Sequence, residues 1–132
     1  MKKNVQNYAF LVKLGLIFIV LCNIIACSAP RPTNLGITEQ GSLLPCPSSP
    51  NCVSTLATDK EHQIAALPYK GSKDESQKKL IDIIEATKNT AIVKNERNYL
   101  HVEFTTALMR YVDDVEFLFN DSTQTIHFRS AS

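Results

Sequence analysis

The sequence lacks the short motifs that mark several common enzyme classes. It contains no Gly-x-Ser-x-Gly nucleophile turn, no His-Glu-x-x-His metal motif and no glycine-rich phosphate loop. No free cysteine stands beside a histidine, and Ser48, Ser49 and Ser54 have no identifiable base near them, so they are weak candidates for a nucleophile. A basic stripe and an acidic tail are also missing, so nothing indicates a nucleic-acid partner. We therefore predict no cofactor, no metal site and no nucleic-acid binding.

A long apolar run is missing as well, although the chain begins with a short one. Residues 1–26 contain three lysines and no acid, and residues 14–25 are apolar except for Asn23. Such a run is too short for a membrane span, which needs about 20 residues. A basic start, a short apolar core and a small residue before the cut are typical of a signal peptide, which we predict for residues 1–26. An uncleaved membrane anchor is the alternative, and it would also export the rest of the chain.

The residues Ile24-Ile25-Ala26-Cys27 resemble a bacterial lipobox, the peptidase site whose cysteine becomes the lipidated N-terminus. Two or more fatty chains at Cys27 would hold the protein stably on a membrane, whereas one chain gives only marginal attachment. Ser28 follows the cysteine in place of an aspartate. For a bacterium with two membranes, this favours the outer membrane, with the protein facing the periplasm. We predict a lipid-anchored protein of the cell envelope.

Loss of the leader changes the size and charge of the chain. Removing residues 1–26 from the 132 leaves 106, enough for one small domain. Three of the 14 basic residues leave with it and all 13 acidic residues stay, so the mature balance is 11 − 13 = −2. We expect residues 27–44, which are rich in proline, glycine and small polar residues, to form the lipidated cysteine and a flexible tether. Residues 45–132 then form the domain.

Two cysteines remain in the predicted domain, Cys46 and Cys52. In an oxidising compartment, the simplest interpretation of this close spacing is a structural disulfide. A redox pair would favour Cys-x-x-Cys, and a zinc site would need two more ligands at suitable spacing, so both are weaker alternatives. Three prolines within residues 45–52 exclude a helix, and we expect a stiff, proline-rich cystine loop.

The remainder of the domain shows first a helical period and then a period of two. Ser72 and Glu75 form a capping box, and the apolar spacing after them predicts a helix over residues 73–88. Strand-like alternation follows around residues 90–94, 99–105, 114–119 and 125–129. We predict an α+β fold of two layers, in which one helix packs on a small antiparallel sheet of three or four strands preceded by the cystine loop.

The last two strands suggest a hairpin whose register fixes the cross-strand partners. A two-residue loop at Asp121-Ser122 would place opposite charges across from each other on one side of the sheet. The register predicts the pairs Phe117–Ile126, Val115–Phe128, Glu116–His127 and Asp114–Arg129. Asp-Ser is a weak two-residue turn, however, and a shift by two would keep the faces while changing every partner.

The outer face of this sheet, which we call the polar face, carries six ionisable residues: His101, Glu103, Asp114, Glu116, His127 and Arg129. It can be a solvated surface whose charge pairs hold the strands in register. It can also be a functional site. The candidate catalytic residues are then His127, Glu116, Asp114, Glu103 and the loop residue His62, with His101 and Arg129 as candidate ligand-binding residues.

Several strings of the sequence resemble a known family. They are Pro45-Cys46-Pro47-Ser48-Ser49-Pro50-Asn51-Cys52, Val112-Asp113-Asp114-Val115-Glu116-Phe117, and Ile126-His127 with Arg129-Ser130-Ala131-Ser132. They are similar to the domain-of-unknown-function family 1499 over roughly residues 43–132. The resemblance implies a bacterial envelope or plastid protein with no established activity. It also implies a further segment after Ser132, so this chain resembles a shortened member.

Two functional hypotheses follow. The first is a lipid-anchored, non-catalytic module that binds an envelope partner or a small ligand through the polar face and the cystine loop. The second is a small hydrolytic enzyme that uses a histidine and a carboxylate of the polar face. Geometry distinguishes them, because a concave pocket where His127 and two acids converge would favour the enzyme.

Overall fold

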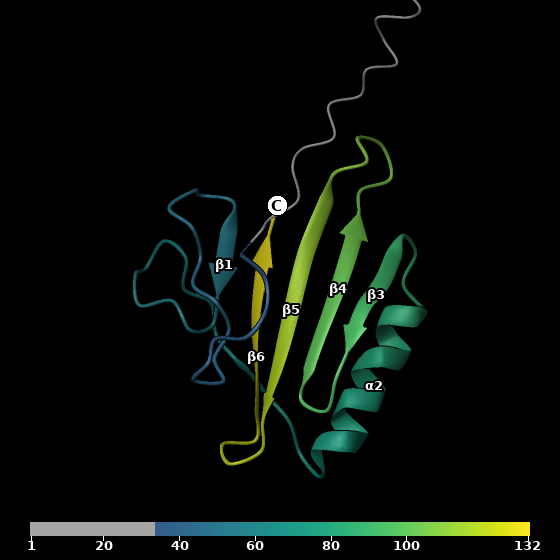
Figure 1. The fold of residues 1–132 in the computed structure, drawn as a ribbon. Helices are drawn as coiled ribbons and strands as arrows, with labels where there is room; N and C mark the ends of the chain where they lie inside the picture. The colour runs from purple at the N-terminus through teal and green to yellow at the C-terminus, as the bar shows by residue number, and fades with distance from the viewer. Residues whose placement is uncertain (1–33) are drawn as a thin grey trace, which may run out of the picture. The chain divides into compact units, whose positions relative to one another are not determined.

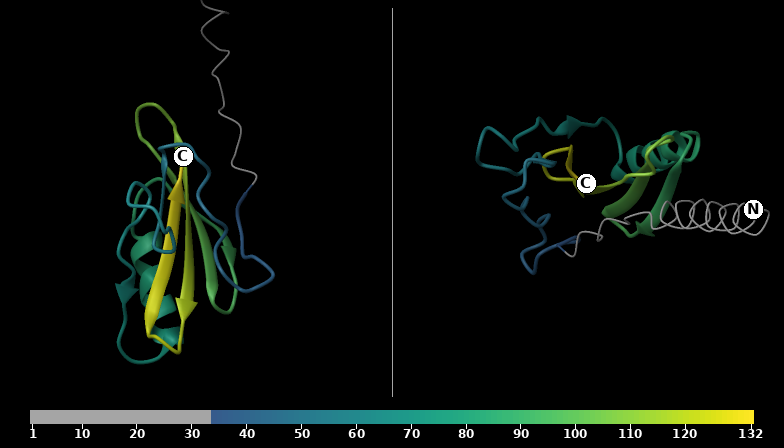
Figure 2. Two further views of the ribbon diagram at one scale, coloured as in Figure 1. Left: turned by 90° about the vertical axis from the view of Figure 1, so that its left-hand side faces the viewer. Right: turned by 90° about the horizontal axis from the view of Figure 1, so that it is seen from above.

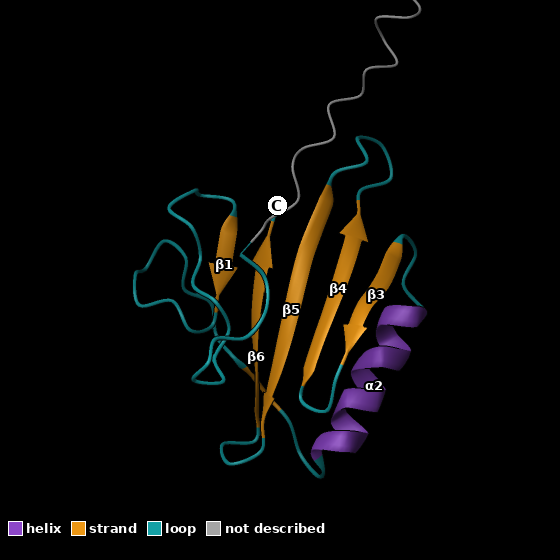
Figure 3. Cartoon of the chain, in the orientation of Figure 1, coloured by secondary structure: helices purple, strands orange, loops and turns teal. Residues whose placement is uncertain are grey.

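The computed structural model describes residues 34–132, and their main element is one antiparallel sheet of six strands (Figures 1 and 3). The strands are β1 (Cys52–Ser54), β2 (Leu67–Pro68), β3 (Thr90–Asn95), β4 (Tyr99–Thr105), β5 (Val112–Asn120) and β6 (Thr125–Ala131). They lie in the order β1-β6-β5-β4-β3, and β2 also pairs with β6. The predicted signal peptide and Cys27 lie outside the described residues.

The predicted sheet of three or four strands is wrong, because two short strands extend it. β1 pairs with the end of β6 through Cys52 and Ala131, and β2 pairs with its start through Leu67 and Ile126. Both therefore lie along the same edge of β6. They are three and two residues long, too short to show an alternating pattern, and they belong to a segment whose prolines suggested only loops.

Helix α2 (Lys73–Glu85) begins as predicted and ends earlier than predicted. The Ser72 hydroxyl accepts a hydrogen bond from the backbone N–H of Glu75, and the Glu75 side chain accepts one from the Ser72 N–H, which completes the capping box. The helix ends at Glu85, and side-chain hydroxyl groups then donate hydrogen bonds to backbone carbonyls of its last turn. Thr90 Oγ1, for example, donates to the backbone oxygen of Ile84 at 2.9 Å. No helix within residues 34–132 is long and apolar enough to cross a membrane.

The period of two separates the sheet into two faces, as the sequence predicted. The face toward α2, the helix face, contains the main core with Leu100, Val102, Phe117 and Phe119. Ile84 of the helix packs on it and is buried, whereas Ile83 of the predicted apolar stripe is exposed. Because adjacent side chains alternate across the sheet, the ionisable residues of β4, β5 and β6 other than Asp113 lie on the opposite, polar face.

The β5–β6 register differs from the prediction by two residues. Phe117 pairs with Phe128 and Glu116 with Arg129, so each residue keeps its face and changes its partner. The reason is a longer turn over residues 121–124. Asn120 Oδ1 accepts from the N–H of Ser122 at 3.1 Å and closes an Asx-type turn. Gln124 then takes a left-handed conformation with φ 50° before β6 begins.

The described part of the segment expected to form a tether contacts the sheet. Residues 34–44, the covering segment, lie across the polar face, on the side of the sheet opposite α2 (Figure 2). Ile37 and Leu43 form an antiparallel bridge with each other, and Leu43 is buried against Tyr99 and Leu118. The sequence did not predict this role, because two aliphatic side chains in a run of small polar residues show no periodicity.

Candidate functional site

Glu116 is the centre of the polar face. It has no solvent exposure, and its carboxylate accepts three hydrogen bonds. The Tyr99 hydroxyl donates to Oε1 at 2.6 Å, the Gly36 backbone N–H donates to the same oxygen at 2.5 Å, and Arg129 Nη1 donates to Oε2 at 2.7 Å. These donors come from β4, the covering segment and β6. Glu116 therefore joins the covering segment to two strands of the sheet.

Arg129 is buried as completely as Glu116, with 0% exposure. Only Nη1 is paired, with Glu116, while Nε and Nη2 have no hydrogen-bond partner among the described residues. The guanidinium thus keeps two donors along one edge that Glu116 does not use. In protein interiors such donors are normally satisfied by a water molecule or an anion.

Burial also governs the chemistry of Tyr99, whose hydroxyl lies against Glu116. Removal from water raises the pKa of this phenol well above its usual range, and the hydrogen bond and charge of Glu116 raise it further. The neutral hydroxyl is therefore the form that persists, and it acts as a donor to the carboxylate. The arrangement provides no phenolate for base catalysis near neutral pH.

A second buried pair lies beside the first. His101 Nε2 is 2.6 Å from Asp114 Oδ1, and both side chains are buried. In the β-ladders, His101 is opposite Glu116, and Asp114 is opposite Glu103. Four of the sequence-predicted residues, His101, Asp114, Glu116 and Arg129, are therefore brought together in one cluster. A fourth strand reaches the same cluster because Ser54 of β1 pairs with Arg129.

The remaining predicted residues lie apart from this cluster or at its margin. His127 is opposite Leu118, and its Nδ1 is 3.2 Å from Thr55 Oγ1, so the predicted pair with Glu116 is not formed. Glu103 is partly exposed on β4. His62 Nδ1 is 2.6 Å from Asp59 Oδ1, and His62 Nε2 is 3.2 Å from the backbone oxygen of Ser49. His62 therefore fastens its own loop to the cystine loop.

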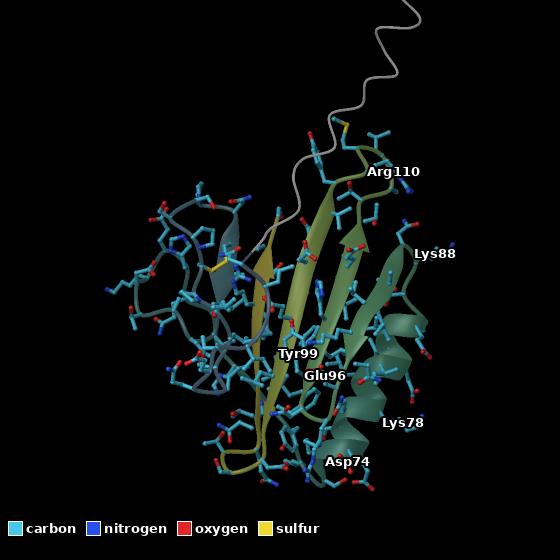
Figure 4. The ribbon with its side chains drawn as sticks, viewed as in Figure 1. Asp74, Lys78, Lys88, Glu96, Tyr99 and Arg110 are labelled. Atoms are coloured by element: carbon cyan, nitrogen blue, oxygen red, sulfur yellow. A yellow bond between two sulfur atoms is a disulfide. The ribbon has the colours of Figure 1, made fainter. Side chains whose placement is uncertain are left out.

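The cystine loop is closed in the structure by the disulfide Cys46–Cys52, which appears as a sulfur–sulfur bond beside β1 in Figure 4. Cys52 is buried and pairs with Ala131 at the end of β6. The backbone N–H of Ser132 donates to the oxygen of Asn51 at 3.1 Å, which continues this pairing. The loop thus holds the free edge of the last strand.

The polar face is consequently neither the solvated surface nor the concave catalytic pocket that the sequence left as alternatives. Its central charges are paired in the interior, beneath the covering segment. Sequence reasoning missed the covering because no motif indicates it. It also missed Tyr99 as a functional partner, although the alternation of β4 placed that residue on the same face as His101.

The hollow that solvent reaches lies on the other side of the sheet. Helix α2 packs against β3 and β5 and does not reach β6, so part of the helix face has no helix over it. A pocket of about 360 Å³ lies there. It is lined by Leu67, Phe104, Asp113, Val115, Phe117, Phe128 and Ser130. We call it the phenylalanine pocket.

The phenylalanine pocket has one charged group. Asp113 lies at its wall, and the Ser132 hydroxyl donates a hydrogen bond to the Asp113 carboxylate. The sequence predicted these phenylalanines as core residues, and nothing in their spacing predicted that the helix would leave them uncovered. A second hollow of about 460 Å³ at the opposite end of β5 is lined mainly by polar residues, among them Lys73, Arg97 and Asp121.

Comparison with known proteins identifies the family. The family model described as Protein of unknown function (DUF1499) matches residues 42–132. The chain belongs to this family. No curated protein and no solved structure matches the chain. Within the described part of this DUF1499 protein, no group of three or more histidines, cysteines and acids is placed to hold a metal ion.

Proposed function

We propose that this DUF1499 protein is a lipid-anchored protein of the bacterial envelope whose domain binds a small, mainly apolar ligand without catalysing a reaction. The observation that carries the binding proposal is the phenylalanine pocket. Its volume of about 360 Å³ and its aromatic walls are those of small-molecule sites, which are mostly apolar with a few polar groups that orient the ligand.

The buried charges support the absence of catalysis. A general base must reach the proton that it removes, within about 3 Å or through one water. Glu116, one of the sequence candidates, is fully buried and already accepts three hydrogen bonds. His127 bonds Thr55 instead of a carboxylate. The cluster therefore serves to hold the covering segment on the sheet.

Charge indicates which ligands suit the pocket. Asp113 is the only ionisable residue in its lining, so an apolar molecule with a cationic or hydrogen-bond-donating group is favoured over one with a carboxylate. The ligand would place its apolar part against Phe104, Phe117 and Phe128.

Fluorescence of the apolar probe N-phenyl-1-naphthylamine tests binding to a domain of residues 28–132. We expect the fluorescence intensity of the probe to increase when the domain is added. Decylamine should displace the probe at a lower concentration than decanoate does. Ser130→Trp, which fills the pocket wall, should reduce the probe signal at least tenfold. Lys79→Trp on the exposed side of α2 is the matched control and should leave it unchanged. Equal signals from the two variants would contradict binding at this pocket.

The anchor is tested separately by the intact mass of the chain purified from bacterial membranes. A mass equal to residues 27–132 plus a diacylglyceryl group is the expected result. An unmodified cysteine at position 27 would overturn the anchor and leave the pocket measurement standing.

A further inference from the structure

The loop between β4 and β5, residues 106–111, is an exposed apolar projection that the proposed pocket does not use. Leu108 is 88% exposed, Met109 63% and Tyr111 57%. The described residues contain eight large apolar side chains that are at least 38% exposed, and three of the eight fall within the four consecutive positions 108–111. We call residues 106–111 the hairpin tip. Clustering of this kind marks an interaction surface, whereas single exposed apolar residues are ordinary.

The hairpin tip extends beyond the end of the sheet, and Arg110 lies at it (Figure 4). Two hydrogen bonds between Thr106 and Tyr111 close the turn: the Tyr111 N–H donates to Thr106 Oγ1 at 2.9 Å, and the Thr106 N–H donates to the backbone oxygen of Tyr111 at 2.8 Å. A closed turn of this kind presents its side chains outward. The loop contains one arginine and no acid.

We propose that the hairpin tip inserts into the surface of the lipid bilayer that carries the anchor. Leucine and methionine supply apolar area, tyrosine is suited to the boundary between hydrocarbon and water, and arginine keeps its charge at the level of the phosphates. This inference rests on the anchoring part of the proposed function, and not on the pocket.

The short length of chain between Cys27 and the domain supports the lipid bilayer as the partner of the hairpin tip. Because the covering segment is packed on the sheet, only seven residue steps separate Cys27 from Asn34, in place of the longer tether that the sequence suggested. Seven residues span at most about 24 Å when fully extended. A lipid at Cys27 therefore keeps the domain close to the bilayer.

The covering segment contacts the sheet at the middle of β5. The Gly36 N–H bonds Glu116, which lies four residues along β5 from Val112 at the base of the hairpin tip, about 13 Å along the strand. The covering segment is thus bound no farther than half the length of β5 from the base of the hairpin tip. A tether of about 24 Å is long enough for the tip to reach the membrane that holds the lipid.

Tryptophan fluorescence tests the insertion with the full chain expressed in bacteria and reconstituted in phospholipid vesicles. The sequence contains no tryptophan, so one substitution gives a single probe. Tyr111→Trp replaces an exposed aromatic ring at the hairpin tip, and Ser122→Trp places the probe in the exposed β5–β6 turn at the opposite end of β5. Vesicles with brominated acyl chains should quench the hairpin-tip probe at least fivefold more than the probe in the β5–β6 turn.

A second variant separates insertion from mere proximity. Leu108→Ser with Met109→Ser, added to Tyr111→Trp, removes the apolar side chains without touching the core, and quenching should fall to the level of the Ser122→Trp variant. Equal quenching of the two probes, or a blue shift of the hairpin-tip probe that depends on protein concentration without vesicles, would overturn the insertion; the latter result would indicate self-association. The mass at Cys27, measured on the same samples, reports the anchor independently.

Discussion

Arg129 and Glu116 face each other across β6 and β5, with 2.7 Å between Nη1 and Oε2, and neither side chain has any solvent exposure. Two charges taken out of water in this way are tolerated because each offsets the charge of the other. The pair also explains how an acid-rich strand can lie in the interior of a small domain. Removal of either partner alone should therefore destabilise the domain.

Glu116→Ala should lower the free energy of unfolding by about 3–5 kcal/mol, because it leaves the Arg129 charge buried without its counterion. Urea denaturation followed by circular dichroism measures this. The double variant Glu116→Met with Arg129→Met, which removes both charges and keeps the volume, should recover most of the loss. A single variant that loses less than about 1 kcal/mol would mean that Arg129 reaches solvent.

Tyr99→Phe should lower the free energy of unfolding by about 1.5–3 kcal/mol, the usual contribution of a hydrogen bond to a charged group. The Tyr99 hydroxyl donates to Glu116 at 2.6 Å in a buried site. Tyr111→Phe is the matched control, since Tyr111 is exposed and its hydroxyl has no role in the fold. The control should change stability by less than about 0.5 kcal/mol. Similar losses from the two variants would contradict the assigned bond.

Stability should fall between about pH 10 and pH 12 because of Tyr69. Burial, followed by the hydrogen bond to Asp121, raises the pKa of Tyr69 from 10 to about 12 in the folded protein. Below pH 10 the phenol is neutral in both states and the stabilisation is complete. Above pH 10 the phenol is deprotonated in the unfolded state but still protonated in the folded state. The free energy of unfolding therefore decreases until the pH passes the folded pKa.

Tyr69→Phe should flatten this pH dependence when urea midpoints are compared at pH 9, 10 and 11. The substitution should not abolish the pH dependence, because the pKa of Tyr99 is also raised in the folded protein. A slope that does not change in the variant would assign the alkaline transition to other groups.

The pKa of His62 should fall when Asp59 is replaced by asparagine. The hydrogen bond to Asp59, followed by the contact with the Ser49 carbonyl, raises the His62 pKa above its ordinary value. The stabilisation from this contact is therefore complete below the ordinary histidine pKa of 6.5 while Asp59 remains ionised, and it is lost as the pH rises through the folded pKa of His62. A histidine NMR titration measures the shift.

Glu61→Gln is the control for His62. Glu61 contributes the smallest of the effects that raise the His62 pKa, so its removal should change that pKa less than Asp59→Asn does. If both variants lowered the pKa equally, long-range charge would outweigh the hydrogen bond, contrary to the geometry.

Replacing Cys46 and Cys52 together by serine should lower the free energy of unfolding by about 2.4 kcal/mol, the chain entropy of a closed loop of seven residues. Thermal or urea denaturation of the variant against the oxidised protein measures this. The loss should be accompanied by faster amide exchange at the end of β6, because Cys52 pairs with Ala131 there. Unchanged exchange would show that the loop does not hold that edge.

Local features of the sequence predicted the local structure. The capping box of Ser72 and Glu75 places the start of α2, because both its hydrogen bonds lie within four residues. The alternation in β4, β5 and β6 assigns each side chain to a face, because the pleat repeats every two residues. The short spacing of Cys46 and Cys52 indicated the pairing that the structure contains.

Partners across the chain required the tertiary structure. A turn of two or of four residues after Asn120 leaves the alternation of β5 and β6 unchanged, so the register that joins Glu116 to Arg129 could not be chosen from their pattern. Likewise, β1 and β2 gain their strand conformation from the edge of β6 and not from their own three and two residues.

The sequence by itself thus determined where the helix begins, which strands alternate and which residues of each strand share a face. Only the tertiary structure decided that residues 34–44 cover the charges and that α2 leaves the phenylalanine pocket uncovered. The physical reason is that burial depends on which distant segment packs over a face. Which segment covers a face depends on the packing of a few side chains, such as Leu43, that are distant in sequence from that face. Such isolated side chains produce no periodic pattern in the sequence.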